Sequence, residues 1–408
     1  MRITSTKPVL RFPEFKEDWK EYRLSDFLTR YSETNKDEEF TIDDILSLSS
    51  HYGIVSRKEL LEDTYSNVNH LAYKKTRKND FVFGKSISAS YPYGLFKVND
   101  YKDGLLSTLY FTFKVKENVF PKFLDCYFSH LNRANNFLRK YVLVGDRYIT
   151  ADADYLLSGQ IYLPKQKEEQ YKIADFLIQV DNRIKQLKEK KENIECYKKV
   201  ITKKLFSKQL RFKDESGKEF PDWKKYSIKT VLERFTKPVD VNPHKYYEQI
   251  GIKSHGKGIF HKEAVTGKIL GNKRVFWIEE DKLILNIVFA WERAVAKTSS
   301  AEKGKVASHR FPMYKTKTDL LNLDYILLFF LTPRGKKYLE LASPGGAGRN
   351  KTLGQTEFEN LKFEIPSLKE QVKISSFLNA IDKQIDLVSQ QTKRTVKFKE
   401  GLLQNLFV

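Results

Sequence analysis

The chain has 408 residues, a hydrophobic fraction of 40%, and 73 Lys and Arg against 52 Asp and Glu, which gives a formal net charge of +21. This composition excludes a disordered chain, and the length exceeds that of a usual single domain, so two or more domains are expected. Only two cysteines occur, which excludes a disulfide framework.

The charge excess predicts a polyanionic partner, and a nucleic acid is the partner that we expect. An anionic membrane surface is the alternative, but no basic amphipathic terminus or lipidation signal accompanies the charge. Residues 1–8 have no apolar signal core, and the longest apolar run, residues 325–331, is far shorter than a membrane span. We therefore expect a cytoplasmic protein without a membrane partner.

The first predicted domain lies at about residues 10–160 and mixes short β-rich runs with turn signals. Two such runs are residues 80–83 (Asp-Phe-Val-Phe) and residues 108–115. The domain opens with residues 10–13 (Leu-Arg-Phe-Pro), followed by Trp19.

The next stretch, residues 165–208, predicts one long helix. It contains no Pro, and its apolar residues alternate at four- and three-residue intervals, which is typical of a coiled-coil seam. A helix of about 40 residues would be roughly 60 Å long. The stripe consists of Ile173, Leu177, Val180, Ile184, Leu187, Ile194, Ile201 and Leu205.

The second half of the chain repeats this order. Residues 210–212 are again Leu-Arg-Phe, and residues 220–223 are Phe-Pro-Asp-Trp. The start of the long helix at residues 164–170 (Pro, then Glu-Gln) returns at residues 366–371. A period near 200 residues indicates a duplicated domain rather than a solenoid. The second stripe consists of Ile374, Leu378, Ile381, Ile385, Val388, Leu402 and Leu406.

The predicted fold class is α+β. Two domains of mixed α/β structure, residues 1–162 and 210–364, are separated by two long helices, residues 163–209 and 365–408. Because the two apolar stripes are equivalent, we expect the helices to pack antiparallel on each other as a coiled coil, in a pseudo-two-fold internal repeat. The alternative is that each helix packs on its own domain, which periodicity alone does not exclude.

The repeated Phe-Pro and Trp openings and the repeated helix starts resemble those of the specificity subunit of type I restriction-modification systems, over nearly the whole chain. The resemblance implies two target-recognition domains, each reading one half of a bipartite site on double-stranded DNA. It also implies that the helices space these domains and dock two methyltransferase (modification) subunits, through which restriction (translocase) subunits join. The chain itself would be a non-catalytic DNA-binding subunit.

No cofactor is expected in this chain, because the resemblance implies that the partner subunits use S-adenosylmethionine, ATP and Mg²⁺. Residues 242–244 (Asn-Pro-His) begin like a methyltransferase loop but lack its second Pro. Residues 251–258 approach a phosphate-binding loop but lack the Ser or Thr that holds Mg²⁺. The seven His and two Cys show no metal-ligand spacing, so no metal site is expected.

Two other function classes are open alternatives. A single-chain DNA methyltransferase or nuclease is disfavoured by the missing motifs, and binding of S-adenosylmethionine by the purified chain would revive it. A coiled-coil scaffold that never contacts DNA is disfavoured by the net charge of +21, and a gel shift on genomic fragments would discriminate.

Three matched pairs of stretches contain the side chains that base reading in the major groove requires. The first pair is the Gly-flanked loops, residues 145–148 and 345–352. The second pair, residues 85–91 and 291–294, follows the strand that an Asp opens in each half (residues 80–83 in the first). The third pair surrounds Ser107 in the first half and residues 308–310 in the second. For the second and third pairs, a contact to DNA and a scaffold role are both open.

Two basic clusters, residues 74–78 and 268–274, are better suited to phosphate than to bases. Phosphate contacts add affinity and salt dependence without sequence specificity. The candidate DNA-binding residues are Lys74, Lys75, Arg77, Lys85, Ser86, Tyr91, Ser107, Arg147 and Tyr148 in the first half, and Lys268, Arg274, Arg293, Ser308, His309, Arg310, Arg349, Asn350 and Lys351 in the second.

Overall fold

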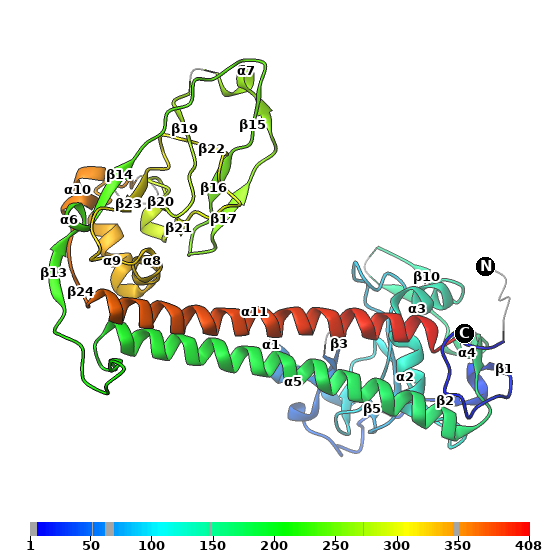
Figure 1. The fold of residues 1–408 in the computed structure, drawn as a ribbon. Coiled ribbons are helices and arrows are strands. Elements are labelled where there is room, and N and C mark those ends of the chain that lie inside the picture. The colour runs from blue at the N-terminus through cyan, green and yellow to red at the C-terminus, as the bar shows by residue number, and fades with distance from the viewer. Residues whose placement is uncertain (1–5, 51, 62–68, 147, 272, 346–350) are drawn as a thin grey trace. The chain divides into compact units, whose positions relative to one another are not determined.

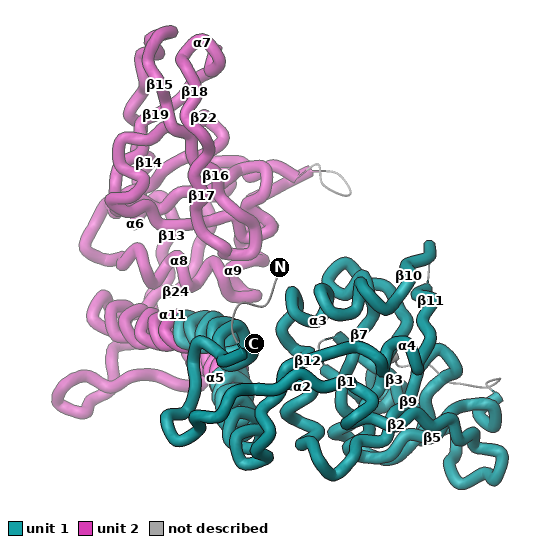
Figure 2. The backbone as a smooth tube through the Cα atoms, turned by 90° about the vertical axis from the view of Figure 1, so that its right-hand side faces the viewer, with its two compact units in different colours: residues 1–189, 389–408 teal, residues 190–388 magenta. Residues whose placement is uncertain are grey.

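The structure is a computed structural model that describes residues 6–50, 52–61, 69–146, 148–271, 273–345 and 351–408. The chain divides into two compact units (Figure 2): unit 1 contains residues 1–189 and 389–408, and unit 2 contains residues 190–388. Each unit combines one mixed α/β domain with a stretch of each of two long helices, α5 (Lys167–Phe206) and α11 (Leu368–Asn405).

The domain of unit 1 contains twelve strands and four α-helices among its described residues. In chain order they are β1 (Lys20–Arg23), β2 (Leu28–Tyr31), β3 (Leu46–Ser49), β4 (Gly53–Ser56), α1 (Arg57–Leu61), β5 (Lys74–Thr76), β6 (Phe81–Gly84), β7 (Leu95–Val98), β8 (Gly104–Leu106), β9 (Tyr110–Val115), α2 (Pro121–Ser129), α3 (Leu131–Leu138), β10 (Val142–Val144), β11 (Ile149–Ala151), α4 (Ala153–Leu157) and β12 (Gln160–Leu163). An antiparallel sheet in the order β2-β9-β6-β7 forms its centre, and β1-β12, β3-β4, β5-β8 and β10-β11 form antiparallel pairs.

The domain of unit 2 repeats this plan. Its elements are β13 (Lys224–Ser227), α6 (Ile228–Val231), β14 (Leu232–Phe235), β15 (Tyr246–Tyr247), β16 (Ile250–Ile252), β17 (Ile259–His261), β18 (Val265–Thr266), α7 (Gly267–Leu270), β19 (Val275–Trp277), β20 (Leu283–Leu285), β21 (Val295–Lys297), β22 (Val306–Ser308), β23 (Met313–Thr316), α8 (Leu323–Leu331), α9 (Pro333–Leu341), α10 (Gln355–Asn360) and β24 (Lys362–Ile365). The sheet β14-β23-β20-β21 corresponds to β2-β9-β6-β7, and the pairs β13-β24, β16-β17 and β19-β22 correspond to β1-β12, β3-β4 and β5-β8. The predicted duplication and the α+β fold class are therefore confirmed.

Helices α5 and α11 pack against each other and run antiparallel (Figure 1). In unit 1, Lys399 Nζ lies 2.6 Å from Asp181 Oδ1, and in unit 2, Lys198 Nζ lies 2.5 Å from Asp382 Oδ1. The two ion pairs are copies of each other, because both residues shift by the same offset (382 − 181 = 201 and 399 − 198 = 201). The lysines occupy polar positions of the predicted seam, and the ion pairs satisfy their charge there.

The predicted apolar stripes are buried where they meet other elements. Helix-on-helix packing is confirmed, and the stripe ends also join the domain cores, as the alternative required. Ile173 and Leu177 belong to the core of unit 1, and Ile374 and Leu378 belong to the core of unit 2.

A buried Glu at the start of each long helix joins that helix to its domain. Arg11 donates from Nε and Nη2 to Glu169 at 2.7 and 2.8 Å, and Arg211 donates in the same way to Glu370 at 3.1 and 2.8 Å. Each Arg belongs to a copy of the repeated Leu-Arg-Phe segment, and each Glu belongs to a copy of the repeated helix start. Two motifs that lie far apart in the sequence therefore meet in one contact in each unit. The repeated motifs therefore have a structural role.

The following Gln completes this junction in both units. Gln170 Nε2 donates to Pro164 O at 3.1 Å, and Gln371 Nε2 donates to Pro366 O at 2.9 Å. The C-terminal end of each long helix packs against the domain of the other copy. Phe407, just after α11, contacts the ring of Trp19 in unit 1, and Phe206, at the end of α5, contacts the ring of Tyr325 in unit 2. Within the part of the chain that the structure describes, no helix has the length and apolar character needed to cross a bilayer.

Candidate nucleic-acid interface

Strand pairing in unit 1 brings the first basic cluster beside the first Ser-centred stretch. β5 and β8 are antiparallel, and Lys74 lies opposite Leu106, the residue before Ser107. The basic cluster and the Ser-centred stretch are about 30 residues apart in the sequence, and this strand pairing makes them neighbours.

The equivalent pairing in unit 2 does the same. β19 and β22 place Val275 opposite Ser308, and His309 N donates to Arg274 O at 3.1 Å. Arg274, His309 and Arg310 are all exposed. The basic cluster and the Ser-centred stretch are therefore adjacent in both copies.

The first Gly-flanked loop lies beside the stretch that follows β6. Ile149 N donates to Lys85 O at 3.0 Å, and Ser86 forms an isolated antiparallel bridge with Tyr148. Ser86 and Tyr91 also line a hollow of about 130 Å³. Two of the predicted stretches of unit 1, residues 85–91 and 145–148, thus meet at Lys85 and Ser86.

The second Gly-flanked loop makes the corresponding contact in unit 2. Leu353 N donates to Ile287 O at 2.8 Å, directly after β20. Gly345 and Lys351 close the loop through an isolated bridge, and Lys351 Nζ lies 5.6 Å from the ring centroid of Trp291. The same backbone hydrogen bond therefore anchors the loop in both copies, although the loop sequences differ.

Three cations of unit 1 converge on one aromatic ring. Around Phe111, Arg30 Cζ lies at 5.6 Å, Lys74 Nζ at 5.4 Å and Lys85 Nζ at 3.9 Å from the ring centroid. Lys74 Nζ also donates to Tyr110 O at 2.7 Å. The negative face of the ring and this carbonyl hold the cations in place.

The charge of this cluster is poorly compensated. Among the described residues, neither lysine forms an ion pair with a carboxylate, and Arg30 has only Asp154 at 3.7 Å. The pKa of Lys74 is lowered by burial and by the neighbouring charges of Lys85 and Arg30. Burial and Arg30 likewise lower the pKa of Lys85. An anion such as a DNA phosphate would relieve this repulsion.

Lys75 is a correction to the sequence-based expectation. Its side chain is 1% exposed, and Nζ donates to Glu33, Asp37 and Glu39 at 2.9, 2.6 and 2.8 Å. Successive side chains of a strand point to opposite faces, so β5 turns Lys75 away from the face that Lys74 occupies. A phosphate has no access to this ammonium group, and the expected phosphate contact is wrong for Lys75.

Two of the predicted arginines are already engaged inside their units. Arg77 makes a two-pronged contact with Glu39 at 2.5 and 2.8 Å, and this contact is the main cause that lowers the pKa of Glu39 to about 2. Arg293 Nη1 donates to Leu331 O at 3.0 Å. A base-reading role would require both guanidinium groups to leave these partners.

Three basic residues of the cluster at residues 268–274, namely Lys268, Lys273 and Arg274, line a hollow of about 640 Å³ between α7 and β19. These three residues are exposed, and among the described residues none forms an ion pair. Arg147, Arg349 and Asn350 lie outside the residues that the structure describes.

The sequence did not single out Arg30, Lys273 or Phe111 as site residues. Arg30 and Phe111 lie on β2 and β9, far from Lys85 in the sequence, and no local pattern predicts that they converge. Lys273 was inside a basic cluster that the sequence analysis identified, so its charge was a usable signal.

In the loop that resembles a phosphate-binding motif, residues 251–258, backbone N–H groups donate to carbonyl groups of the protein itself. Lys253 N donates to Gly258 O at 2.9 Å, His255 N to Glu292 O at 2.7 Å and Gly256 N to Arg293 O at 3.0 Å. It joins β16 to β17 and opens no helix. These residues do not fit a nucleotide phosphate, as the missing Ser or Thr predicted.

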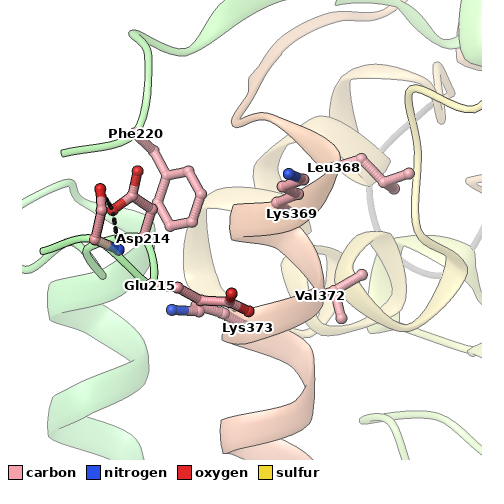
Figure 3. Close-up of a pocket in the computed structure, with 8 residues that line it drawn as sticks. Asp214, Glu215, Phe220, Leu368, Lys369, Val372 and Lys373 are labelled. Atoms are coloured by element: carbon pink, nitrogen blue, oxygen red, sulfur yellow. Dashed lines mark hydrogen bonds between the residues drawn. The ribbon is translucent and has the colours of Figure 1, made fainter. Parts of the chain in front are cut away.

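A further hollow of about 560 Å³ lies beside the first turns of α11 (Figure 3). Phe220, Leu368 and Val372 line it together with residues of both charges, including Asp214 and Lys373. Its mixed charge does not match a polyanion, and none of the predicted site residues lines it.

A family model described as the type I restriction modification DNA specificity domain matches residues 16–196 and again residues 221–397. The type I restriction enzyme MjaVIII specificity subunit of Methanocaldococcus jannaschii is 25% identical over 208 residues, which are 50% of this chain and 46% of the relative. The chain thus spans about half the length of the curated relatives that it matches.

Two solved structures resemble the fold of the chain. The S subunit of a type I restriction-modification system from M. genitalium has a TM-score of 0.54 at 12% identity, over 98% of this chain and 99% of that chain. A chain from a study of complex assembly and conformational transition of the type I R-M system has a TM-score of 0.53 at 13% identity, over 97% and 98%.

Proposed function

The chain belongs to the family of type I restriction-modification DNA specificity proteins, and from this premise we propose that it is the non-catalytic DNA-reading subunit of such a system. The observation that carries the proposal is the duplicated interface. In both units one antiparallel strand pair brings a basic cluster beside a Ser-centred stretch, and a backbone hydrogen bond joins a Gly-flanked loop to the stretch that follows β6 or β20 of the central sheet.

Each target-recognition domain, residues 1–162 and residues 210–364, reads one half of a bipartite target. In unit 1, Lys74 and Lys85 contact phosphates, with Arg30 beside them, and Lys75 takes no part. The base-reading candidates of unit 1 are Ser86, Tyr91, Ser107, Arg147 and Tyr148. In unit 2, Lys268 and Arg274 contact phosphates, and the base-reading candidates are Ser308, His309, Arg310, Arg349, Asn350 and Lys351. Because Arg77 and Arg293 have partners inside the fold, they rank below these residues.

The two long helices set the separation between the half-sites. A helix of 40 residues is about 60 Å long, and a partner packed along it resists bending. The matched ion pairs of α5 and α11 support a fixed register between the helices, because a slip of one helix would break both. A fixed register implies a fixed number of unread base pairs.

The chain acts within a larger complex. Two methyltransferase subunits dock on the helices, and restriction subunits join through them. S-adenosylmethionine, ATP and Mg²⁺ serve those partner subunits. The likeness to a chain from a study of type I R-M complex assembly supports this part of the proposal.

Methylation mapping tests the proposal most directly. Cells that express the chain with its methyltransferase partner should acquire methylation at one bipartite motif, and cells lacking the chain should not. Replacing residues 214–360 with the matching segment of a relative should change one half of the motif only. A change in both halves would contradict the two-module proposal.

Calorimetry distinguishes this function from a single-chain DNA methyltransferase or nuclease. Titration of the pure chain with S-adenosylmethionine and with ATP should show no saturable heat. Micromolar binding of either ligand would overturn the non-catalytic assignment.

A further inference from the structure

The β10–β11 hairpin of unit 1 presents apolar side chains that its own fold does not use. Leu143 is 75% exposed, Val144 is 51% exposed and Tyr148 is 53% exposed. Val142, at the base of the same hairpin, and Ile149, which lies opposite Val144, are 7% and 3% exposed and belong to the core of unit 1. The hairpin is therefore anchored in the core, while the apolar side chains of its tip (Leu143, Val144 and Tyr148) stay exposed and add little to the stability of the fold.

Leu143, Gly145 and Tyr148 are held by contacts from two directions. Within the hairpin, Gly145 N donates to Tyr148 O at 3.1 Å, and Leu143 lies opposite Thr150 across the ladder. From outside, the bridge between Ser86 and Tyr148 fixes it to the stretch after β6. A surface that is ordered in this way loses little conformational entropy when it binds a partner.

The hairpin adjoins the poorly compensated cation cluster of unit 1. Ile149 N donates to Lys85 O, and Lys85 Nζ shares the ring of Phe111 with Lys74 and Arg30. A partner that covers the tip must therefore also accept this positive charge. A DNA duplex does both, because its phosphates flank grooves that expose base edges.

We propose that β10–β11 enters the major groove of the half-site read by unit 1, where Leu143 and Val144 contact thymine methyl groups. A two-stranded ribbon fits the major groove, and the thymine methyl is the apolar group that this groove presents. Lys74, Lys85 and Arg30 contact the flanking phosphates. The inference rests on the proposed DNA-reading function and assigns part of its specificity to apolar contacts.

The corresponding loop of unit 2 has a different chemistry. Residues 345–351 are Gly-Gly-Ala-Gly-Arg-Asn-Lys, with no aliphatic side chain larger than that of Ala. Arg and Asn suit hydrogen bonds to purine edges rather than methyl groups. The two halves of the target are therefore read by unlike chemistry on one scaffold.

Base substitution in the DNA isolates the methyl contact. The probe is a duplex that carries the motif found by methylation mapping, with thymines of the unit 1 half-site replaced one at a time by deoxyuridine. At one or two positions the full chain, in complex with its methyltransferase partner, should bind about fourfold more weakly, because one buried methyl group contributes about 0.8 kcal/mol. The same replacement in the unit 2 half-site should have a much smaller effect.

Protein variants complete the test. Leu143→Ala combined with Val144→Ala should weaken binding to the target by roughly tenfold or more, leave binding to a random duplex unchanged, and abolish the sensitivity to deoxyuridine. Leu143→Met, which keeps the volume, should retain most of the affinity. Leu320→Ala, at an aliphatic side chain of unit 2 that is 40% exposed, is the matched control and should bind as the unmodified chain does.

The outcomes separate this inference from the proposed function. If the target is bound and methylated normally by the double variant, DNA reading stands and the hairpin proposal is overturned. Equal weakening on target and random duplexes, or a loss of methyltransferase assembly, would assign the tip to another contact and would also overturn it. If the unmodified chain with its partner binds no motif preferentially, the proposed function itself fails.

Discussion

Arg211→Ala should destabilise unit 2 more than Arg11→Ala destabilises unit 1. Glu370 is 0% exposed, and Arg211 supplies two hydrogen bonds to it. Glu169 is 2% exposed and accepts from Arg11 in the same way. It also accepts a hydrogen bond from Trp19 Nε1 at 3.1 Å.

The equivalent tryptophan of unit 2 makes no such bond. Trp223 Nε1 is buried and, among the described residues, has no hydrogen-bond partner. Arg211→Ala therefore leaves a buried carboxylate without a side-chain donor, whereas Arg11→Ala leaves one that keeps a donor. The duplication supplies a matched pair of sites in which the Glu of unit 1 has a second side-chain donor and the Glu of unit 2 does not.

The magnitude follows from the cost of an unpaired buried charge. Removing one partner of a buried pair costs about 3–5 kcal/mol, and the partial exposure of the Arg211 side chain, 19%, favours the lower end. A hydrogen bond to a charged group contributes about 1.5–3 kcal/mol. We expect a loss of about 3 kcal/mol for Arg211→Ala and, because Trp19 still donates to Glu169, only about 0–1.5 kcal/mol for Arg11→Ala.

Hydrogen–deuterium exchange in the full chain measures the two losses separately, at the first turns of α11 and of α5. The double variant Arg211→Ala/Glu370→Gln should recover much of the protection, because the unpaired charge is gone. Trp19→Phe in the Arg11→Ala background should raise its loss to that of Arg211→Ala. An equal or larger loss for Arg11→Ala alone would refute the reasoning.

The other predictions concern DNA binding and acid stability. Lys85→Ala should reduce the slope of log K against log salt by about 0.9, whereas Lys75→Ala should destabilise unit 1 and leave the slope unchanged. Arg349→Ala should weaken target binding by about 1–3 kcal/mol, and equal loss on random DNA would make Arg349 a phosphate contact. Seven residues inserted at matched points of α5 and α11 add about 10 Å, so the spacer between methylated half-sites should grow by roughly three base pairs; an unchanged spacer with full activity would show that the helices do not set it. Because the pKa of Glu39 is held at about 2, below 4.5, its stabilisation is complete above pH 4.5 and is lost as the pH falls towards 2; acid unfolding of Glu39→Gln should lack this component.

The sequence by itself determined the duplication, the α+β class, the two long helices and their seam. These features are repeated or periodic in the sequence. Each helix turn repeats the apolar spacing and each domain copy repeats the motifs, so both can be recognised without the tertiary structure. The same string identified most stretches of the candidate interface. It also disfavoured a nucleotide site at residues 251–258, where the structure shows that the backbone donors bond within the protein.

Only the tertiary structure decided which member of each basic stretch is available to DNA. Lys74 and Lys75 are adjacent and chemically identical, yet strand β5 sends one to the ring of Phe111 and the other to three carboxylates. Those carboxylates, at residues 33–39, lie far from β5 in the sequence. The same is true of Arg30, which joins the cation cluster through the pairing of β2 with β9. A side chain's partners depend on strand register and long-range packing, and neither leaves a periodic trace in the sequence.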